Sequence, residues 1–280
     1  MTSKILKIAL VGRTNAGKST LINRIVGEKI SIQNKKINTT QVTIMGVKNI
    51  KKTQLIFYDT PGSNFLKSLN TQSRNLKINL WSGIDESDII FYLIDSKTAN
   101  IKFLFEQIDK LQEVKKKIIV IFNKIDLISN KQLLPLISDL DKKFNIDSFF
   151  TISAIQNIGV KDLLGYIEKY SYASKWIFND DEITNKDDIF IVGELLRETM
   201  LTYLHKEIPY NVNIETSNFK TLKNNDIKIK QKIIINQKRY KKIILGKKGE
   251  MIKKIREDSQ KKMSQILNSK IHLYLEILNA

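Results

Sequence analysis

One short motif constrains this chain of 280 residues more than any other feature. Residues 12–19 read Gly-Arg-Thr-Asn-Ala-Gly-Lys-Ser and fit the pattern G-x-x-x-x-G-K-[ST] at every fixed position. The strand-like run Ile5–Val11 precedes the motif, and the helix-like segment Thr20–Val26 follows it. Glycines in such a place let backbone N–H groups close around phosphates at a helix N-terminus. The motif therefore predicts a phosphate-binding loop, with a chance glycine-rich turn as the alternative.

Two side chains of this loop have an expected task in binding a nucleotide. Lys18 would reach the β- and γ-phosphates, and Ser19 would ligate Mg²⁺. The predicted phosphate-binding residues are Gly12, Arg13, Thr14, Asn15, Ala16, Gly17, Lys18, Ser19 and Thr20.

A second motif follows the strand-like run Gln54–Tyr58, which ends in Asp-Thr-Pro-Gly. Asp59 can hold Mg²⁺ through water, and the Gly62 N–H can sense a γ-phosphate. Alone this is an ordinary turn signature, but after a phosphate loop it indicates a nucleotide-sensing switch. In the polar segment before this strand, Thr40 is the candidate threonine that closes on Mg²⁺, with a solvated loop threonine as the alternative. The predicted switch residues are Thr39, Thr40, Asp59, Thr60, Pro61, Gly62 and Ser63.

Two further signatures indicate which base is bound. In Asn123-Lys-Ile-Asp126, the Asp carboxylate can accept two hydrogen bonds from N1–H and the exocyclic amine of guanine, an arrangement that adenine does not offer. We expect Asn123 to brace the base site and the stem of Lys124 to pack on a ring face. Ser153-Ala154 would offer a backbone N–H to guanine O6. A loop with a capping Asp is the alternative. The predicted guanine-binding residues are Asn123, Lys124, Asp126, Ser153 and Ala154.

Residues 1–170 alternate β-branched runs with amphipathic, helix-like stretches. Runs this apolar predict an α/β domain in which a mostly parallel sheet has helices on both faces. The signatures follow the order found in small GTPases, and the guanine-reading one argues against an ATPase or a kinase. The predicted strands are Ile5–Val11, Gln54–Tyr58, Ile89–Ile94, Ile118–Phe122 and Phe149–Ile152.

The hydrolytic machinery lacks two expected parts. Ser63 stands directly after Asp-x-x-Gly, where Ras-like enzymes have a water-orienting Gln. None of Arg13, Arg24 and Arg74 is an obvious arginine finger, a group that contributes roughly 10³–10⁵ in rate. We therefore expect slow intrinsic hydrolysis. Asn15 suggests another source of positive charge, because GTPases with Asn at this position often bind K⁺ in place of the finger.

Residues 193–280 predict a smaller α+β domain in the order helix, strand, strand, helix, helix, strand, after an acidic linker over residues 171–192. Gly246-Lys-Lys-Gly249 lies between the two consecutive helices. Glycines there let a nucleic-acid backbone approach closely, and a helix N-terminus favours phosphate. This loop is typical of KH RNA-binding domains, and the closing strand Ile271–Ile277 fits the type II order. A helix-breaking glycine pair without a function is the alternative.

The formal charge of +18 supports a polyanionic partner only weakly, because Lys supplies 41 of the 47 basic residues and suggests a coding bias. The distribution of charge is more informative. Residues 176–226 have a net charge of −5, whereas residues 227–280 have a net charge of +11. Such a contrast favours nucleic-acid binding at this end of the chain. The predicted RNA contacts are Gly246, Lys247, Lys248, Gly249, Lys253, Arg239 and Lys242.

The absence of cysteine excludes disulfides, thiolate metal sites and cysteine nucleophiles. No apolar run approaches the roughly 18 residues that a membrane span needs, and no secretory signal precedes the first motif. We expect a soluble, intracellular monomer.

A GTPase domain followed by a type II KH domain resembles the Era GTPases of bacteria. The resemblance covers essentially the whole chain, since Glu194–Thr199 and Glu207–Tyr210 resemble the helix and turn that open the KH domain of Era. It implies a cytoplasmic assembly factor of the 30S ribosomal subunit that uses GTP, GDP and Mg²⁺. It also implies binding to the 3′ end of small-subunit ribosomal RNA and a place at the inner membrane surface. Gln41, Val42 and Ser63 depart from the family pattern.

Three functions stay open at this point. The leading hypothesis is a GTP-hydrolysing switch whose nucleotide state adjusts RNA binding. The second is an RNA-binding assembly module with negligible turnover. The third is a peripheral membrane GTPase whose basic surface binds anionic lipid, although no Trp- and Phe-rich amphipathic helix favours it.

Overall fold

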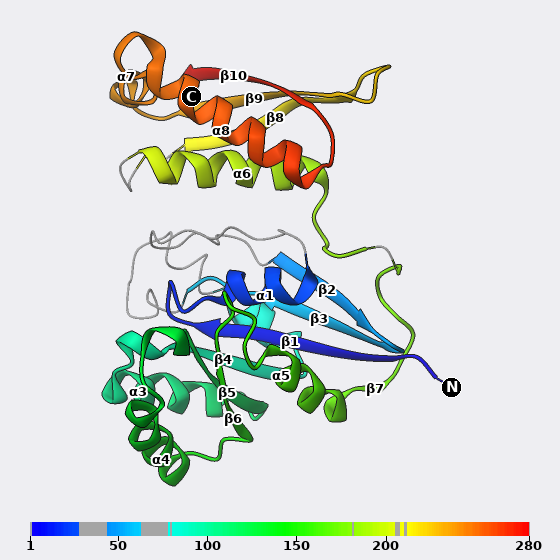
Figure 1. The fold of residues 1–280 in the computed structure, drawn as a ribbon, viewed down its shortest axis with the longest axis vertical. Coiled ribbons are helices and arrows are strands. Elements are labelled where there is room, and N and C mark those ends of the chain that lie inside the picture. Colours follow the sequence, from blue (N-terminus) through cyan, green and yellow to red (C-terminus); the bar gives the residue numbers. More distant parts are fainter. Residues whose placement is uncertain are drawn as a thin grey trace. The chain divides into compact units, whose positions relative to one another are not determined.

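The computed structural model describes residues 2–27, 44–62, 78, 80–180, 182–204, 208–209 and 212–279 (Figure 1). The chain divides into two compact units, with the boundary between Asn185 and Lys186. Among the described residues, no helix has the length and apolar character that a membrane span requires.

Unit 1 is built on a sheet in the strand order β2-β3-β1-β4-β5-β6. All neighbouring strands on this path are parallel except β2, which runs antiparallel to β3 at the edge. A short strand, β7, pairs antiparallel with the start of β1. The strands are β1 Lys4–Gly12, β2 Ile44–Ile50, β3 Thr53–Asp59, β4 Ile89–Asp95, β5 Lys117–Asn123, β6 Ser148–Ile152 and β7 Tyr172–Ala173.

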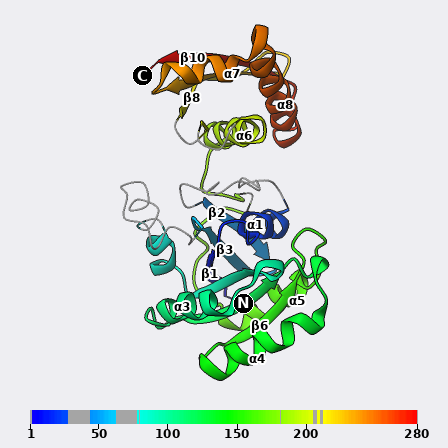
Figure 2. The same cartoon turned by 90° about the vertical axis from the view of Figure 1, so that its left-hand side faces the viewer.

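Helices cover both faces of this sheet (Figures 1 and 2). Residues from α1 and α5 join one core cluster, and residues from α3 and α4 join the other. Along β1, Leu6, Ile8 and Leu10 belong to the first cluster, whereas Ala9 and Val11 belong to the second. The strand is thus buried on both faces, and the predicted α/β fold class is confirmed. The helices are α1 Lys18–Val26, α3 Ile101–Gln112, α4 Leu133–Lys143 and α5 Val160–Ile167.

The segment predicted as a linker, residues 171–192, contains ordered contacts within unit 1. After β7 it follows the β2–β3 hairpin, where the fully buried Gln54 accepts hydrogen bonds from the N–H groups of Ile177 (2.9 Å) and Phe178 (3.0 Å). The Trp176 indole donates to the Lys52 carbonyl at 3.1 Å. These contacts hold the segment against the hairpin.

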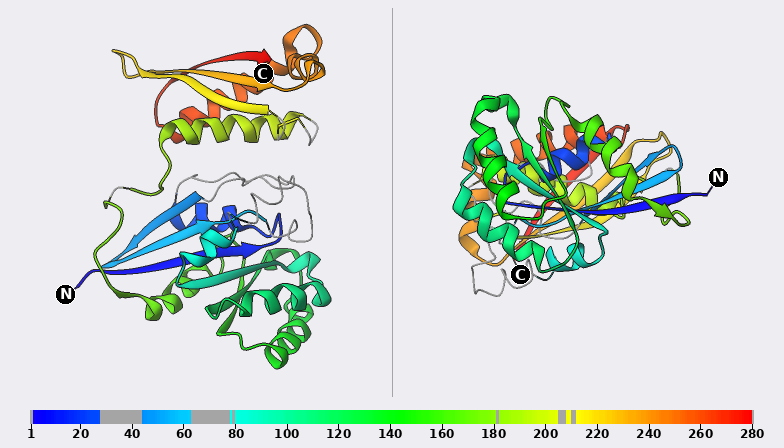
Figure 3. Two further views of the ribbon diagram at one scale, coloured as in Figure 1. Left: turned by 180° about the vertical axis from the view of Figure 1, so that it is seen from behind. Right: turned by 90° about the horizontal axis from the view of Figure 1, so that it is seen from below.

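Unit 2 has a three-stranded sheet in the order β10-β9-β8, with β10 parallel and β8 antiparallel to β9. Its core joins the inward side chains of these strands to α6, α7 and α8. Helices α6 and α8 lie on one side of the three strands (Figure 3, left). The element order matches the predicted helix, strand, strand, helix, helix, strand. The elements are α6 Asp188–Tyr203, β8 Val212–Thr221, β9 Ile227–Ile235, α7 Lys238–Leu245, α8 Glu250–Ile266 and β10 Ile271–Asn279.

Candidate functional site

The predicted nucleotide residues of unit 1 gather at one edge of the sheet. Gly12, Asp59, Asn123 and Ile152 are the last residues of β1, β3, β5 and β6. In open α/β sheets, the crevice beyond the carboxyl ends of the strands is where ligands bind. Parallel pairing therefore brings together motifs that are far apart in the sequence.

The phosphate loop is folded around the ammonium group of Lys18. Its Nζ donates to the Gly12 carbonyl at 3.0 Å and to the Arg13 carbonyl at 3.1 Å, and the side chain is 6% exposed. Burial lowers the pKa of Lys18 to about 8, and the nearby Asp59 carboxylate opposes this effect. Asn15 and Gly17 have positive φ angles of 67° and 99°, which close the turn before α1. The ammonium is thus positioned before any phosphate arrives.

Arg13 points away from this loop toward α3. Its guanidinium carbon lies 4.7 Å from the centroid of the Phe103 ring, a cation–π contact. The expectation that Arg13 is not an arginine finger stays a prediction.

The second motif lies against the phosphate loop. The Ser19 hydroxyl donates to Asp59 Oδ2 at 2.7 Å, and Asp59 is completely buried. The Thr60 hydroxyl donates to the Leu10 carbonyl at 2.5 Å. A Cβ atom on Gly62 would lie 2.8 Å from the backbone nitrogen of Thr14, so only glycine allows this approach.

The oxygens of Ser19 and Asp59 are adjacent hard donors, which is the chemistry that Mg²⁺ prefers. Within the described ranges, no group of three or more His, Asp or Glu side chains could hold a metal ion. A magnesium ion here would need oxygens from nucleotide phosphates as well. The expected ligand Thr40, like Thr39 and Ser63, lies outside the described residues.

Asn123 joins the phosphate loop to the guanine signatures. Its Nδ2 donates to the Ala16 carbonyl at 2.9 Å, while its Oδ1 accepts from the backbone N–H groups of Lys124 (2.9 Å) and Ala154 (3.0 Å). A Cβ on Gly17 would lie only 2.1 Å from Asn123 Nδ2. The structure thus gives Asn123 contacts of the bracing kind that the sequence predicts.

Two of the other guanine candidates, Lys124 and Ala154, contact this side chain through their backbone N–H groups. The Lys124 ammonium pairs with Asp95 at 2.6 Å, which fixes the direction of its stem, and Asp126 is exposed. Ser153 donates its N–H to the Ile158 carbonyl at 3.1 Å. Because the Ala154 N–H already donates to Asn123, an O6 contact through it would be a shared hydrogen bond. The guanine-reading roles stay predictions.

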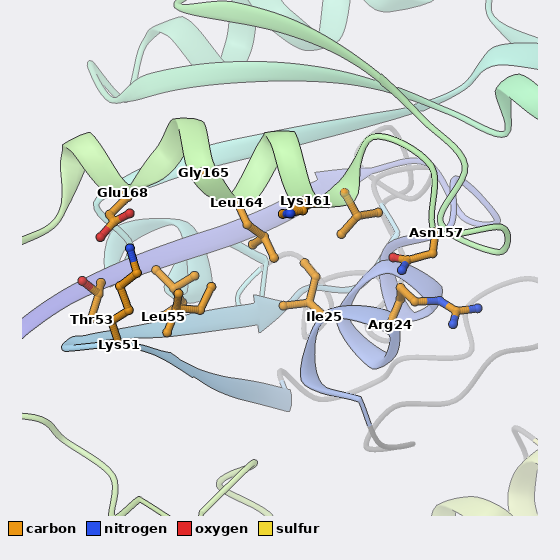
Figure 4. A pocket seen from close by; sticks show the side chains of 12 residues that line it. Arg24, Ile25, Lys51, Thr53, Leu55, Asn157, Lys161, Leu164, Gly165 and Glu168 are labelled. Carbon is orange, nitrogen blue, oxygen red and sulfur yellow. The ribbon is translucent and has the colours of Figure 1, made fainter.

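Arg24 is a residue that the sequence did not single out for this site. From α1 it donates to the carbonyls of Ala154 at 3.1 Å and Ile155 at 2.7 Å. These two hydrogen bonds connect α1 to the loop that carries the predicted guanine contacts. Arg24 and Asn157 also line one end of a pocket of about 440 Å³ between α1, α5 and β3 (Figure 4). No local pattern indicates such a contact, because it joins residues 130 positions apart.

In the predicted RNA loop of unit 2, both glycines adopt the positive φ angles that glycine favours. Gly246 and Gly249 have positive φ angles of 70° and 80°, and Lys248 between them has a φ of 51°. A Cβ on Gly246 would lie 2.5 Å from Met251 Cβ. Lys247 and Lys248 are exposed at the tip, before the N-terminus of α8. The exposed side chains of the remaining basic candidates flank this loop: Arg239, Lys242 and Lys253.

Comparisons with known proteins agree with this geometry. The family described as "50S ribosome-binding GTPase" matches residues 7–124, and the family described as "KH domain" matches residues 207–279. GTPase Era of Agrobacterium fabrum is 35% identical over 268 residues, which cover 96% of this chain and 84% of that protein. The chain belongs to the Era family of GTPases. The predictions of a guanine nucleotide-binding GTPase and of a KH domain are therefore confirmed.

Other Era proteins give the same result. GTPase Era of Rickettsia bellii is 34% identical over 97% of this chain and 91% of that protein. A crystal structure of Era in complex with MgGDPNP and nucleotides 1506–1542 of 16S ribosomal RNA has a TM-score of 0.91 and 30% identity, covering 99% of this chain and 94% of that one. A variant of Aquifex aeolicus Era bound to GDP·AlF4⁻ has the same TM-score and identity, covering 100% and 94%.

Proposed function

We propose that this protein is a GTP-hydrolysing switch that binds the 3′ end of small-subunit ribosomal RNA through unit 2 and assists assembly of the 30S subunit. The observation that carries the proposal is the likeness, over 99% of the chain, to the Era structure that holds both a magnesium nucleotide and a 16S ribosomal RNA segment. The protein would act as a cytoplasmic monomer, and any association with the inner membrane would be peripheral.

The nucleotide site would work mainly by positioning and charge. Lys18 would contact the β- and γ-phosphates, and the N–H groups of the phosphate loop would surround them. Ser19, Thr40 and, through water, Asp59 would hold Mg²⁺, which neutralises charge that develops on the phosphates. Asp126 would accept hydrogen bonds from guanine.

The RNA site would use the glycine loop and its flanking basic side chains. Gly246 and Gly249 leave room for a sugar–phosphate backbone, and Lys247 and Lys248 supply charge. The test is the double substitution Lys247→Asp with Lys248→Asp. We expect binding of the 3′-end RNA to be lost in a fluorescence anisotropy assay while intrinsic GTP hydrolysis stays within about twofold of wild type. RNA affinity close to wild type would contradict the site.

We expect slow GTP hydrolysis because of two residues predicted to lie near the phosphates. Arg13 contacts Phe103, and Ser63 is too short to orient water as Gln does. We propose that K⁺ bound with the help of Asn15 supplies the missing positive charge. Turnover in K⁺ should exceed turnover in Na⁺ by at least about tenfold, because one electrostatic donor contributes roughly 10²–10³ in kcat.

The matched variant for this prediction is Asn15→Gly, because glycine readily adopts the φ of 67° found at this position. It should bind GDP normally and lose the preference for K⁺. Equal turnover in the two salts would refute the K⁺ hypothesis. Turnover that stays negligible in both salts, with RNA present, would favour the second candidate, an RNA-binding assembly module.

A further inference from the structure

The sheet of unit 2 has a face that points away from its core. Along β9, buried residues alternate with lysines, and successive side chains of a strand point to opposite faces. The outward lysines are Lys228, Lys230 and Lys232. The helices that flank the glycine loop pack with the inward residues of β9. The outward face, which we call the outer sheet face, is therefore separate from that loop.

At one end of the outer sheet face, which we call the balanced end, carboxylates offset the charge of the lysine. Lys232 lies opposite Glu215 on β8 and opposite Glu276 on β10. Opposite charges at paired positions stabilise a sheet. This end looks like an ordinary solvated surface, even in a chain rich in lysine.

The other end carries an excess of positive charge. Lys228 lies opposite Lys220 on β8, and like charges at directly paired positions are destabilising. On its other side Lys228 lies opposite His272. The nearby carboxylate of Asp226 lies 2.8 Å from His272 Nε2 and 4.0 Å from the Lys270 ammonium. A general abundance of lysine in the chain does not explain why two lysines are paired at this end while Lys232 is paired with glutamates at the other.

An exposed aromatic ring lies within this positive end. Tyr274 on β10 is 53% exposed and pairs with Lys230 on β9. The Lys228 ammonium lies 5.4 Å from the centroid of the same ring. An exposed ring among cations on an open sheet face offers what a single-stranded nucleic acid needs: a stacking surface for a base and charge for phosphates.

We propose that the positive end of the outer sheet face is a second RNA-binding surface, at which one base stacks on Tyr274 while Lys220, Lys228 and Lys230 contact neighbouring phosphates. The partner is single-stranded RNA without strict sequence preference, because the side chains present charge and a ring face rather than a pattern for base edges. The inference rests on the proposed RNA binding of unit 2 and adds a second contact to it. Two linked contacts bind a longer RNA more tightly than either contact alone.

The experiment compares a short RNA with longer ones. The short probe is the 3′-end segment of about eight nucleotides, and the longer probes carry about twelve added uridines at the 5′ or the 3′ side. Wild-type protein should bind one longer probe roughly five- to 150-fold more tightly, since stacking of a base is worth ~1–3 kcal/mol. Lys228→Gln with Lys230→Gln, and separately Tyr274→Ala, should remove this advantage without changing binding of the short probe.

Two matched variants separate the proposal from a general effect of charge or folding. Lys232→Gln removes a lysine from the same strand and face, at the balanced end, and should keep the advantage. Tyr274→Trp should keep it too, because the ring is retained. Replacing each lysine that contacts a phosphate should also lower the salt dependence, by roughly 0.7 in the slope of log affinity against log salt.

The outcomes distinguish the two proposals. If the short probe does not bind, the proposed RNA function of unit 2 fails. If the short probe binds and neither added tail increases affinity, or Lys232→Gln behaves like the double variant, the outer sheet face is not an RNA site. Loss of binding to vesicles of anionic lipid, with RNA binding unchanged in the same variants, would overturn the proposal in favour of a membrane contact.

Discussion

The buried ammonium of Lys18 makes nucleotide binding sensitive to pH. Its pKa is lowered from 10.5 to about 8 by burial. Between pH 8 and pH 10.5 the unfolded chain binds more protons than the folded one, so the stability of the fold rises with pH in this range. The destabilisation that results from burying Lys18 is complete below pH 8 and fades as the pH rises toward 10.5. Phosphates that contact the ammonium would favour its charged form. Binding of GDP should therefore take up a proton at alkaline pH.

Calorimetry in two buffers of different ionisation enthalpy checks this prediction. Near pH 8 the uptake should be about half a proton per GDP, and it should rise between about pH 7.5 and 8.5. An uptake of zero across this range would mean that Lys18 is already charged in the free protein.

Single residues also mark where sequence patterns stop being informative. The pairing of Ser19 with Asp59 could be expected, because both belong to motifs with a known spacing to strands. The contacts of Arg24 and the use of the Ala154 N–H by Asn123 could not. Both depend on side chains that meet across the fold, and helix or strand periodicity carries no information about such meetings.

At the scale of elements, the segment after β7 depends on one buried amide. Besides accepting two N–H groups, Gln54 donates to the Phe178 carbonyl at 3.0 Å. Gln54→Leu would leave these backbone groups without partners, at a cost of about 2–3 kcal/mol. Urea unfolding should show this loss, and hydrogen exchange at Ile177 and Phe178 should accelerate. Lys52→Ala is the control, because it keeps the backbone carbonyl that accepts the Trp176 indole N–H. Unchanged exchange in Gln54→Leu would refute the role given to this amide.

The predicted strands of unit 1 agree with the observed ones within one or two residues at each end, since their sequences are mostly apolar. The edge strand β2 could not, because Lys48 and Asn49 interrupt its apolar pattern. Helix α6 begins at Asp188, inside the segment that the sequence predicts as a linker. Asp187 and Asp188 suggest an acidic linker, yet Asp187 accepts the Phe190 N–H at 2.8 Å and caps the helix.

At the scale of the whole molecule, each unit has a hydrophobic core of its own. Ligand binding stabilises the part that it contacts, by about 2.7 kcal/mol at a hundredfold excess over Kd. Magnesium GDP should therefore slow hydrogen exchange in β1, α1 and β5 while exchange in β8, β9 and α8 stays unchanged. The comparison of exchange rates with and without nucleotide in the full chain checks this. Equal protection of both units would show that they open together.

The contact between Gly17 and Asn123 has a consequence for how relatives of this chain can diverge. The space that glycine leaves is filled by an amide that holds two other loops. A larger residue at position 17 would meet this amide and would also be strained by the φ of 99° there. A smaller residue at position 123 leaves three backbone groups without their partner. Neither site can change freely, so both residues should be retained together across lineages.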